Sequence, residues 1–143
     1  MTPPVQGRPR TRRPGWRALA VALGAAGTLH LVKPEPYDRL IPRALGAPRP
    51  WVYGSGVAEI ACVAALLVPR TRRLGALASA ALFVGVFPGN VTMAARALRS
   101  PRASARTKAL TVARLPLQVP LVTWALAVAG EVEPVPHGQG RTR

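Results

Sequence analysis

Four long apolar runs alternate with short, charged segments along the chain. The runs cover residues 16–32, 51–68, 74–95 and 109–130, and each is close to the roughly 20 residues that an α-helix needs to cross a bilayer. Backbone that faces lipid must satisfy its own hydrogen bonds, so runs of this length are expected to be helices. The pattern therefore predicts an all-α fold, a four-helix transmembrane bundle formed by residues 16–130.

The segments between the runs indicate the order of the helices. Residues 69–73, PRTRR, leave room only for a tight turn, which makes the second and third helices antiparallel neighbours. Residues 33–50 contain five prolines and charges of both signs, and we expect a connection there with a short interfacial helix at 37–45. Side A denotes the membrane side of the 69–73 turn, and side B the side of the 33–50 connection. Four spans then run up-down-up-down, with both chain ends on side A.

The two ends of the chain lack the apolar pattern. Residues 1–15 are rich in proline and arginine, which predicts a disordered basic N-terminal segment. Residues 131–143 form a polar C-terminal tail. A basic segment before an apolar run is also typical of a cleaved signal peptide, with cleavage near Ala26 as the alternative. We expect the run to be retained as a span.

The chain combines 49% hydrophobic residues with a net charge of +15. A basic chain first suggests nucleic acid, since phosphates attract Lys and Arg. No basic helix face or aromatic stacking platform accompanies the charge, so we expect no nucleic-acid partner and interpret the arginines as anchors beside spans in a lipid bilayer. Ten basic residues fall on side A and nine on side B. The five near the start of the first span favour a cytoplasmic side A, with both termini in the cytoplasm.

Six polar side chains stand out in the apolar runs, all between the middle of the run and side B. They are His30, Ser55, Glu59, Asn90, Arg114 and Gln118. The side-A half of the runs consists mainly of Ala, Leu, Val and Gly instead. Helical spacing puts Ser55 and Glu59 on one face of the second helix, and Arg114 and Gln118 on one face of the fourth. We therefore predict one shared pocket that opens toward side B.

Prolines accompany this group. Pro88 precedes Asn90, and Pro116 and Pro120 flank Gln118. A proline inside a helix removes a backbone donor and frees carbonyls in the preceding turn. We expect Pro88 to interrupt the third helix, and the freed carbonyls to need protein neighbours or water.

Glu59 is the hardest of the six to explain as ordinary packing. Its short side chain lies too deep to reach water alone, so it must be protonated, hydrated or paired. Arg114 is the expected partner, because its charge persists in a low dielectric. Such a pair can equally be a structural clasp between the second and fourth helices. Other interpretations stay open: Arg114 can snorkel to the surface, His30 can cap loop carbonyls, and Asn90 can hold helices together.

The sequence predicts no intrinsic cofactor and no metal site. His30 is the single histidine in the apolar runs, short of the three or four ligands that a metal site needs. Cys62 is the only cysteine, which excludes a disulfide within the chain and a thiol relay. Without a glycine-rich phosphate loop or a nucleophile–base pair, we expect no catalytic activity of the chain on its own.

Several short motifs follow one another in a distinctive order. His30 is followed by Pro34 and Tyr37, then by YGSGVAE at 53–59, PRTRR at 69–73, FPGN at 87–90 and RLPLQ at 114–118. Over residues 16–130 these motifs resemble the DoxX family of small four-helix proteins of the bacterial cytoplasmic membrane. The resemblance implies that His30, Glu59, Asn90, Arg114 and Gln118 carry the family pattern. It also implies redox work, since some members are a subunit of thiosulfate:quinone oxidoreductase or a membrane partner in thiol and superoxide defence. Members that use paired cysteines are not matched, which argues against a thiol–disulfide role.

Three functional hypotheses remain. In the first, the protein is a non-autonomous subunit of a membrane redox system, whose side-B pocket holds a quinone and whose partner is a membrane or soluble oxidoreductase. In the second, it is a non-catalytic membrane scaffold or assembly partner, and the polar cluster only locks the bundle. In the third, Glu59 is the centre of a proton or small-solute pathway.

Overall fold

Helices make up the fold. The computed structural model describes residues 15–39, 41 and 45–131, and these ranges contain no strand. The helices are α1 (Trp16–Val32), α2 (Glu35–Asp38), α3 (Pro48–Leu67), α4 (Arg72–Arg99) and α5 (Ala105–Glu131). The all-α fold class is therefore confirmed. The predicted disordered segment 1–15 and polar tail 131–143 lie outside the described residues, except for Gly15 and Glu131 at their inner edges.

The long helices α4 and α5 contain prolines without being interrupted by them. α3 begins at Pro48, a position where a proline loses no helical hydrogen bond. α4 continues through Pro88, so the predicted interruption there is wrong. The short helix expected at 37–45 lies at Glu35–Asp38 instead, and residues 40 and 42–44 of the expected range are outside the described residues.

Three helices, α3, α4 and α5, are long and apolar enough to cross a membrane, and α1 is shorter, with 17 residues. Large apolar side chains point outward on these helices: Val21 on α1 keeps 72% of its surface exposed, and Leu74 on α4 keeps 66%. Exposing apolar surface to water costs about 25 cal/mol per Å², whereas lipid accepts it without that cost. The helices are thus compatible with a multi-pass membrane protein in contact with the lipid bilayer. The number of spans and their antiparallel order remain predictions.

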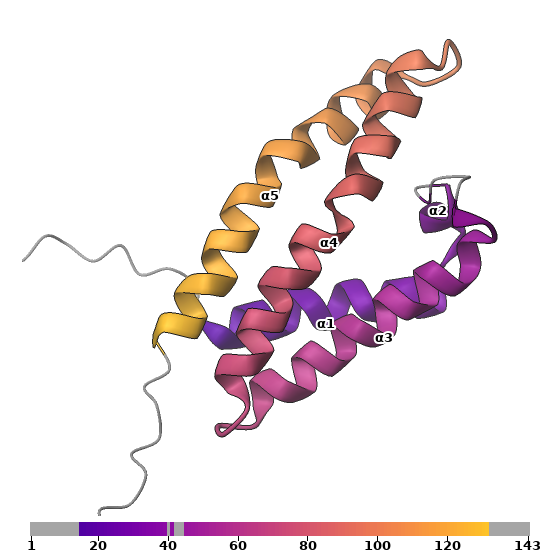
Figure 1. Ribbon diagram of the computed structural model, residues 1–143. Helices are drawn as coiled ribbons and strands as arrows, with labels where there is room; N and C mark the ends of the chain where they lie inside the picture. Colours follow the sequence, from indigo (N-terminus) through magenta and orange to yellow (C-terminus); the bar gives the residue numbers. More distant parts are fainter. Residues whose placement is uncertain (1–14, 40, 42–44, 132–143) are drawn as a thin grey trace, which may run out of the picture.

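The long helices pack as two pairs that meet at one end. α1 packs along α3, and α4 packs along α5. Figure 1 shows the two pairs diverging from the end where α3 passes into α4. That shared end is side A. On side B, α2 lies beside the end of α1 and the start of α3 (Figure 1), and a guanidinium nitrogen of Arg96 on α4 donates to the carbonyl of Arg39 at 2.6 Å.

The hydrophobic core lies in the side-A half, where both pairs contribute. Its buried residues are Leu19, Ala20 and Leu23 of α1, Cys62 and Leu66 of α3, Ala76 and Ala80 of α4, and Ala125, Val128 and Ala129 of α5. Small residues let helix backbones approach closely. Gly75 of α4 is a tight case, because a Cβ at this position would lie 2.8 Å from the backbone nitrogen of Leu66.

Arg72 and Thr71 close the side-A end of α3. Nε of Arg72 donates to the carbonyl of Leu66 at 2.9 Å, and the hydroxyl of Thr71 donates to the carbonyl of Ala65 at 2.9 Å. The last carbonyls of a helix have no partner inside it, so these side chains supply one. The Arg72 guanidinium also lies over the ring of Trp16, 4.0 Å from its centroid, which joins the start of α1 to the α3–α4 turn by a cation–π contact.

Candidate functional site

His30 of α1 and Glu59 of α3 meet in the packed face between these helices. Nδ1 of His30 lies 3.2 Å from Oε2 of Glu59 and 2.8 Å from the carbonyl oxygen of Ala26, one turn earlier on α1. A carbonyl oxygen can only accept a hydrogen bond, so Nδ1 carries a proton. Glu59 keeps only 7% of its surface exposed. A histidine and a buried carboxylate in contact can together hold a proton and pass it on.

Two oxygens on this face of α3 lack a hydrogen-bond partner. The Nδ1–H group of His30 bonds to the Ala26 carbonyl, so Oε2 of Glu59 is close to it but receives no directed hydrogen bond. Oγ of Ser55, one turn before Glu59, is likewise buried and unpartnered. Buried polar atoms in proteins are almost always paired with protein groups or water. This face of α3 therefore favours a further polar contact.

Two glycines bring the helices close enough for the His30–Glu59 contact. A Cβ on Gly27 would lie 2.9 Å from the carbonyl oxygen of Gly56 and 3.0 Å from Cβ of Glu59, and a Cβ on Gly56 would lie 3.0 Å from Cβ of His30. Each glycine precedes a site residue by three positions, which places it one turn away on the same helix face. The repeated spacing, Gly-x-x-His and Gly-x-x-Glu, is the sequence feature that accompanies this contact.

The end of α1 is recessed relative to the start of α3. His30 is two residues from the end of α1, and Glu59 is eleven residues from the start of α3. At about 1.5 Å per residue, these positions are roughly 3 Å and roughly 16 Å from the respective helix ends. Because the two side chains touch, α1 stops about 13 Å short of the side-B end of α3. The ring of Tyr37, on α2, occupies part of this space and stacks on His30, with ring centroids 3.9 Å apart.

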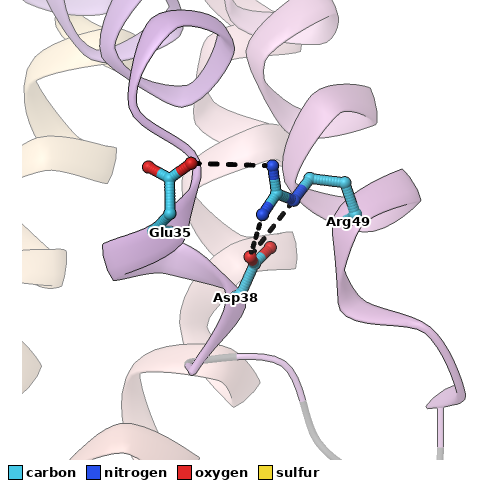
Figure 2. A network of polar contacts seen from close by, with 3 residues as sticks. All are labelled: Glu35, Asp38 and Arg49. Atoms are coloured by element: carbon cyan, nitrogen blue, oxygen red, sulfur yellow. Dashed lines mark hydrogen bonds and ion pairs between the residues drawn. The ribbon is translucent and has the colours of Figure 1, made fainter.

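A network of charges ties α2 to α3 on side B (Figure 2). Arg49 lies in the first turn of α3, and its Nη2 and Nε are 2.8 Å and 3.1 Å from Oδ2 of Asp38. Its Nη1 is 3.7 Å from Oε1 of Glu35. Both carboxylates belong to α2, so Arg49 holds the short helix that carries Tyr37. The other oxygen of Asp38, Oδ1, is buried without a hydrogen-bond partner.

Asn90 and Gln118 form a separate link, between α4 and α5. Nδ2 of Asn90 donates to Oε1 of Gln118 at 3.2 Å, and Nε2 of Gln118 donates to the carbonyl oxygen of Phe83. Pro88 removes the helical partner of the Val84 carbonyl, four residues earlier, and not that of Phe83. The Gln118 bond is therefore additional to the helical ladder, and the two amides hydrogen-bond α4 and α5 together.

An apolar hollow opens beside Gln118. Its volume is about 340 Å³, and its lining consists of Val84, Phe87, Leu115, Gln118, Val119, Val122 and Thr123. Apart from Gln118 and Thr123, these side chains are apolar, so the hollow suits an apolar chain better than a polar ligand.

Arg114 takes part in neither group of contacts. Its side chain is exposed, and within the described ranges it forms no ion pair. The expected pair of Glu59 with Arg114 therefore does not form, because α3 packs against α1 and α4 and not along α5. The structure brings His30, Ser55 and Glu59 to the α1–α3 face. It brings Asn90 and Gln118 to the α4–α5 face, and among the residues it describes no hydrogen bond or ion pair joins the two groups.

In the described part of the chain, no three His, Cys, Asp or Glu side chains are grouped so that they could hold a metal ion.

The fold and its apolar surface have the character of a small helical membrane protein. The family model described as Domain of unknown function (DUF8561) matches residues 19–129, and the chain belongs to this family. Comparison with curated proteins gives no match, and comparison with solved structures gives none either.

Proposed function

We propose that this chain is a DoxX-like membrane protein with four antiparallel spans in up-down-up-down order. It lies in the bacterial cytoplasmic membrane, with both termini in the cytoplasm, and supports a membrane redox system as a non-autonomous subunit that binds a quinone. The observation that carries the proposal is the buried contact between His30 and Glu59. Two groups that exchange protons, held together within apolar helices, suit the chemistry of a lipid-soluble redox carrier.

The chemical role follows from what a quinone needs. Its reduction to a quinol adds a proton to each carbonyl oxygen as electrons arrive. In this proposal the electrons come from a partner oxidoreductase, and the His30–Glu59 pair delivers or removes a proton. The apolar hollow lies on the other helix pair, between α4 and α5, and its lining suits part of an isoprenoid tail.

The test is to extract lipid from the purified protein and measure quinone by chromatography. The proposal expects near-stoichiometric quinone with the wild type and a large loss with Glu59→Gln. Glu131→Gln is the matched control, because that exposed carboxylate at the end of α5 lies in neither group of contacts. A wild-type protein that retains no quinone would overturn the quinone assignment.

The second candidate is a membrane scaffold, and the Asn90–Gln118 link favours it. Both polar ends of the Gln118 amide are bonded to α4, which is how a side chain acts when it holds helices together. Turnover of the partner in membranes separates the two candidates. If Glu59→Gln lowers quinone-dependent turnover without lowering membrane abundance, the redox role stands. If Glu59→Gln leaves turnover intact while deletion of the protein removes the partner, the scaffold role replaces it.

A further inference from the structure

The two halves of the α1–α3 face differ in what surrounds Glu59. Toward side A, the next buried positions on α3 are Cys62 and Leu66, which belong to the core with Leu19 and Leu23 of α1. The buried hydroxyl of this half, that of Ser79 on α4, is already paired, because it donates to the carbonyl of Gly75 at 2.6 Å. A buried water molecule would find few hydrogen-bond partners in this half, and apolar cavities in proteins stay dry.

Toward side B, buried oxygens without a hydrogen-bond partner lead outward from Glu59. Oε2 of Glu59 and Oγ of Ser55 are buried without a hydrogen-bond partner and lie about 6 Å apart along α3, one turn of four residues at about 1.5 Å each. Asp38 on α2, farther out, carries a third such oxygen. Polar atoms in this position are where proteins hold internal water.

We infer that Glu59 exchanges protons with side B alone, by way of Ser55 and Asp38 of α2, so that the protein is a one-sided proton site and not a path across the membrane. This goes beyond the proposed function, because the sidedness follows from the packing whether or not a quinone binds. It also replaces the third hypothesis, in which protons or solutes pass from side to side through Glu59.

The charged and titratable neighbours of Glu59 agree with one-sided access. His30 from α1 contacts Glu59 directly, and Tyr37 from α2 covers His30 on the side-B edge. Next to Tyr37, Asp38 is paired with Arg49. On the side-A edge stands Cys62, a thiol within the apolar core. In the described residues no charged side chain of α4 or α5 pairs with Glu59, so the charged groups nearest to it lie on its side-B edge.

The first test measures water access from each membrane face with a charged, membrane-impermeant thiol reagent. Single-cysteine variants carry Ser55→Cys, Lys33→Cys as the side-B marker, or Arg70→Cys as the side-A marker, each with Cys62→Ala. Spheroplasts and inside-out vesicles present the two faces. We expect Ser55→Cys to react from the face that labels Lys33→Cys and not from the other. In the wild type, Cys62 should react from neither face. Reaction of Ser55→Cys from the Arg70 face, reaction from no face, or labelling of Cys62 overturns the inference.

The second test follows the proton itself. A hydrophobic carbodiimide modifies carboxyl groups in their protonated form, and mass spectrometry locates the product, with Glu59→Gln as the blank. The pH is held constant on one face of the membrane and varied on the other. Labelling of Glu59 should fall as the pH on side B rises, and it should not depend on the pH on side A. Labelling that follows side-A pH, or that is absent at every pH, overturns the inference. Sided labelling in a protein that retains no quinone would keep the inference and reject the proposed function.

Discussion

Replacing Gly27 by alanine tests whether glycine contact holds α1 against α3. The new Cβ would lie 2.9 Å from the carbonyl oxygen of Gly56, 3.0 Å from Cβ of Glu59 and 3.1 Å from Cδ1 of Ile60. The first two neighbours belong to the packed α3 segment and cannot swing away as the end of a long side chain can. Relieving the clash moves the helices apart and weakens the His30–Glu59 contact.

The magnitude is best read against Gly24→Ala, one turn earlier on α1. There the new Cβ meets only Cγ2 of Val63, at an ordinary 3.8 Å. Both substitutions gain about 1 kcal/mol of helix propensity, whereas only Gly27→Ala incurs the typical overpacking cost of about 1–3 kcal/mol. The two variants should therefore differ in the free energy of unfolding by about 1–3 kcal/mol. At roughly 2–4 °C per kcal/mol, this is a gap of roughly 2–12 °C in Tm.

The chain carries its own reporter for the measurement. Cys62 is the only cysteine and is buried in the core, so a thiol-reactive fluorogenic dye reacts when the bundle opens on heating in detergent. Wild type, Gly24→Ala and Gly27→Ala are heated in parallel, and the midpoints of the dye signal are compared. Equal midpoints for the two variants would refute the argument that close backbone approach at Gly27 positions the site.

Three further outcomes follow from the same packing. Gln118→Leu removes both bonds from its amide to α4, and should lower the free energy of unfolding by roughly 0.6–1.7 kcal/mol per bond, measured with the same dye. Arg114→Gln removes an exposed charge and should stay within the roughly 0.5 kcal/mol usual for surface changes; a large loss would mean that this arginine pairs with the acid of α3 after all. Gly75→Ala puts a Cβ 2.8 Å from the nitrogen of Leu66, whereas a Cβ on Gly85 meets nothing within 4 Å. The yield of folded protein by size-exclusion chromatography should fall for Gly75→Ala only, and equal yields would contradict the tight turn.

The helices could be predicted because apolar runs of this length have few other structures available in a membrane. The partner of Glu59 could not, for a geometric reason. In a sequence, the depth of a residue can be measured only from the end of its own helix, and comparing such depths assumes that all helices start level. α1 is recessed, so His30, near its own helix end, is level with the middle of α3. The persistent charge of Arg114 makes it the expected partner, but helical spacing gives the face on which a residue lies without telling which helix that face meets.

The prolines give a similar lesson about local signals. Pro88 predicts a break when α4 is considered alone. In the structure α4 continues through Pro88 and packs along α5. A helix packed against a neighbour tolerates a proline that would interrupt it in isolation. The glycine spacing around His30 and Glu59 was visible in the sequence, but its meaning depends on α1 and α3 being neighbours.

The stacking of Arg72 on Trp16 places a constraint on the order of events during synthesis. The first helix leaves the ribosome about 56 residues before the guanidinium that will cover its first turn. At roughly 5–20 residues per second, this delay lasts roughly 3–11 s. During that time α1 has neither its cation–π contact nor the α3 backbone against its glycines, and its outward apolar surface is all that holds it in place. The contact that fixes the first turn of α1 can therefore form only after the α3–α4 turn has been made, later than the glycine contacts of α1 with α3 become possible.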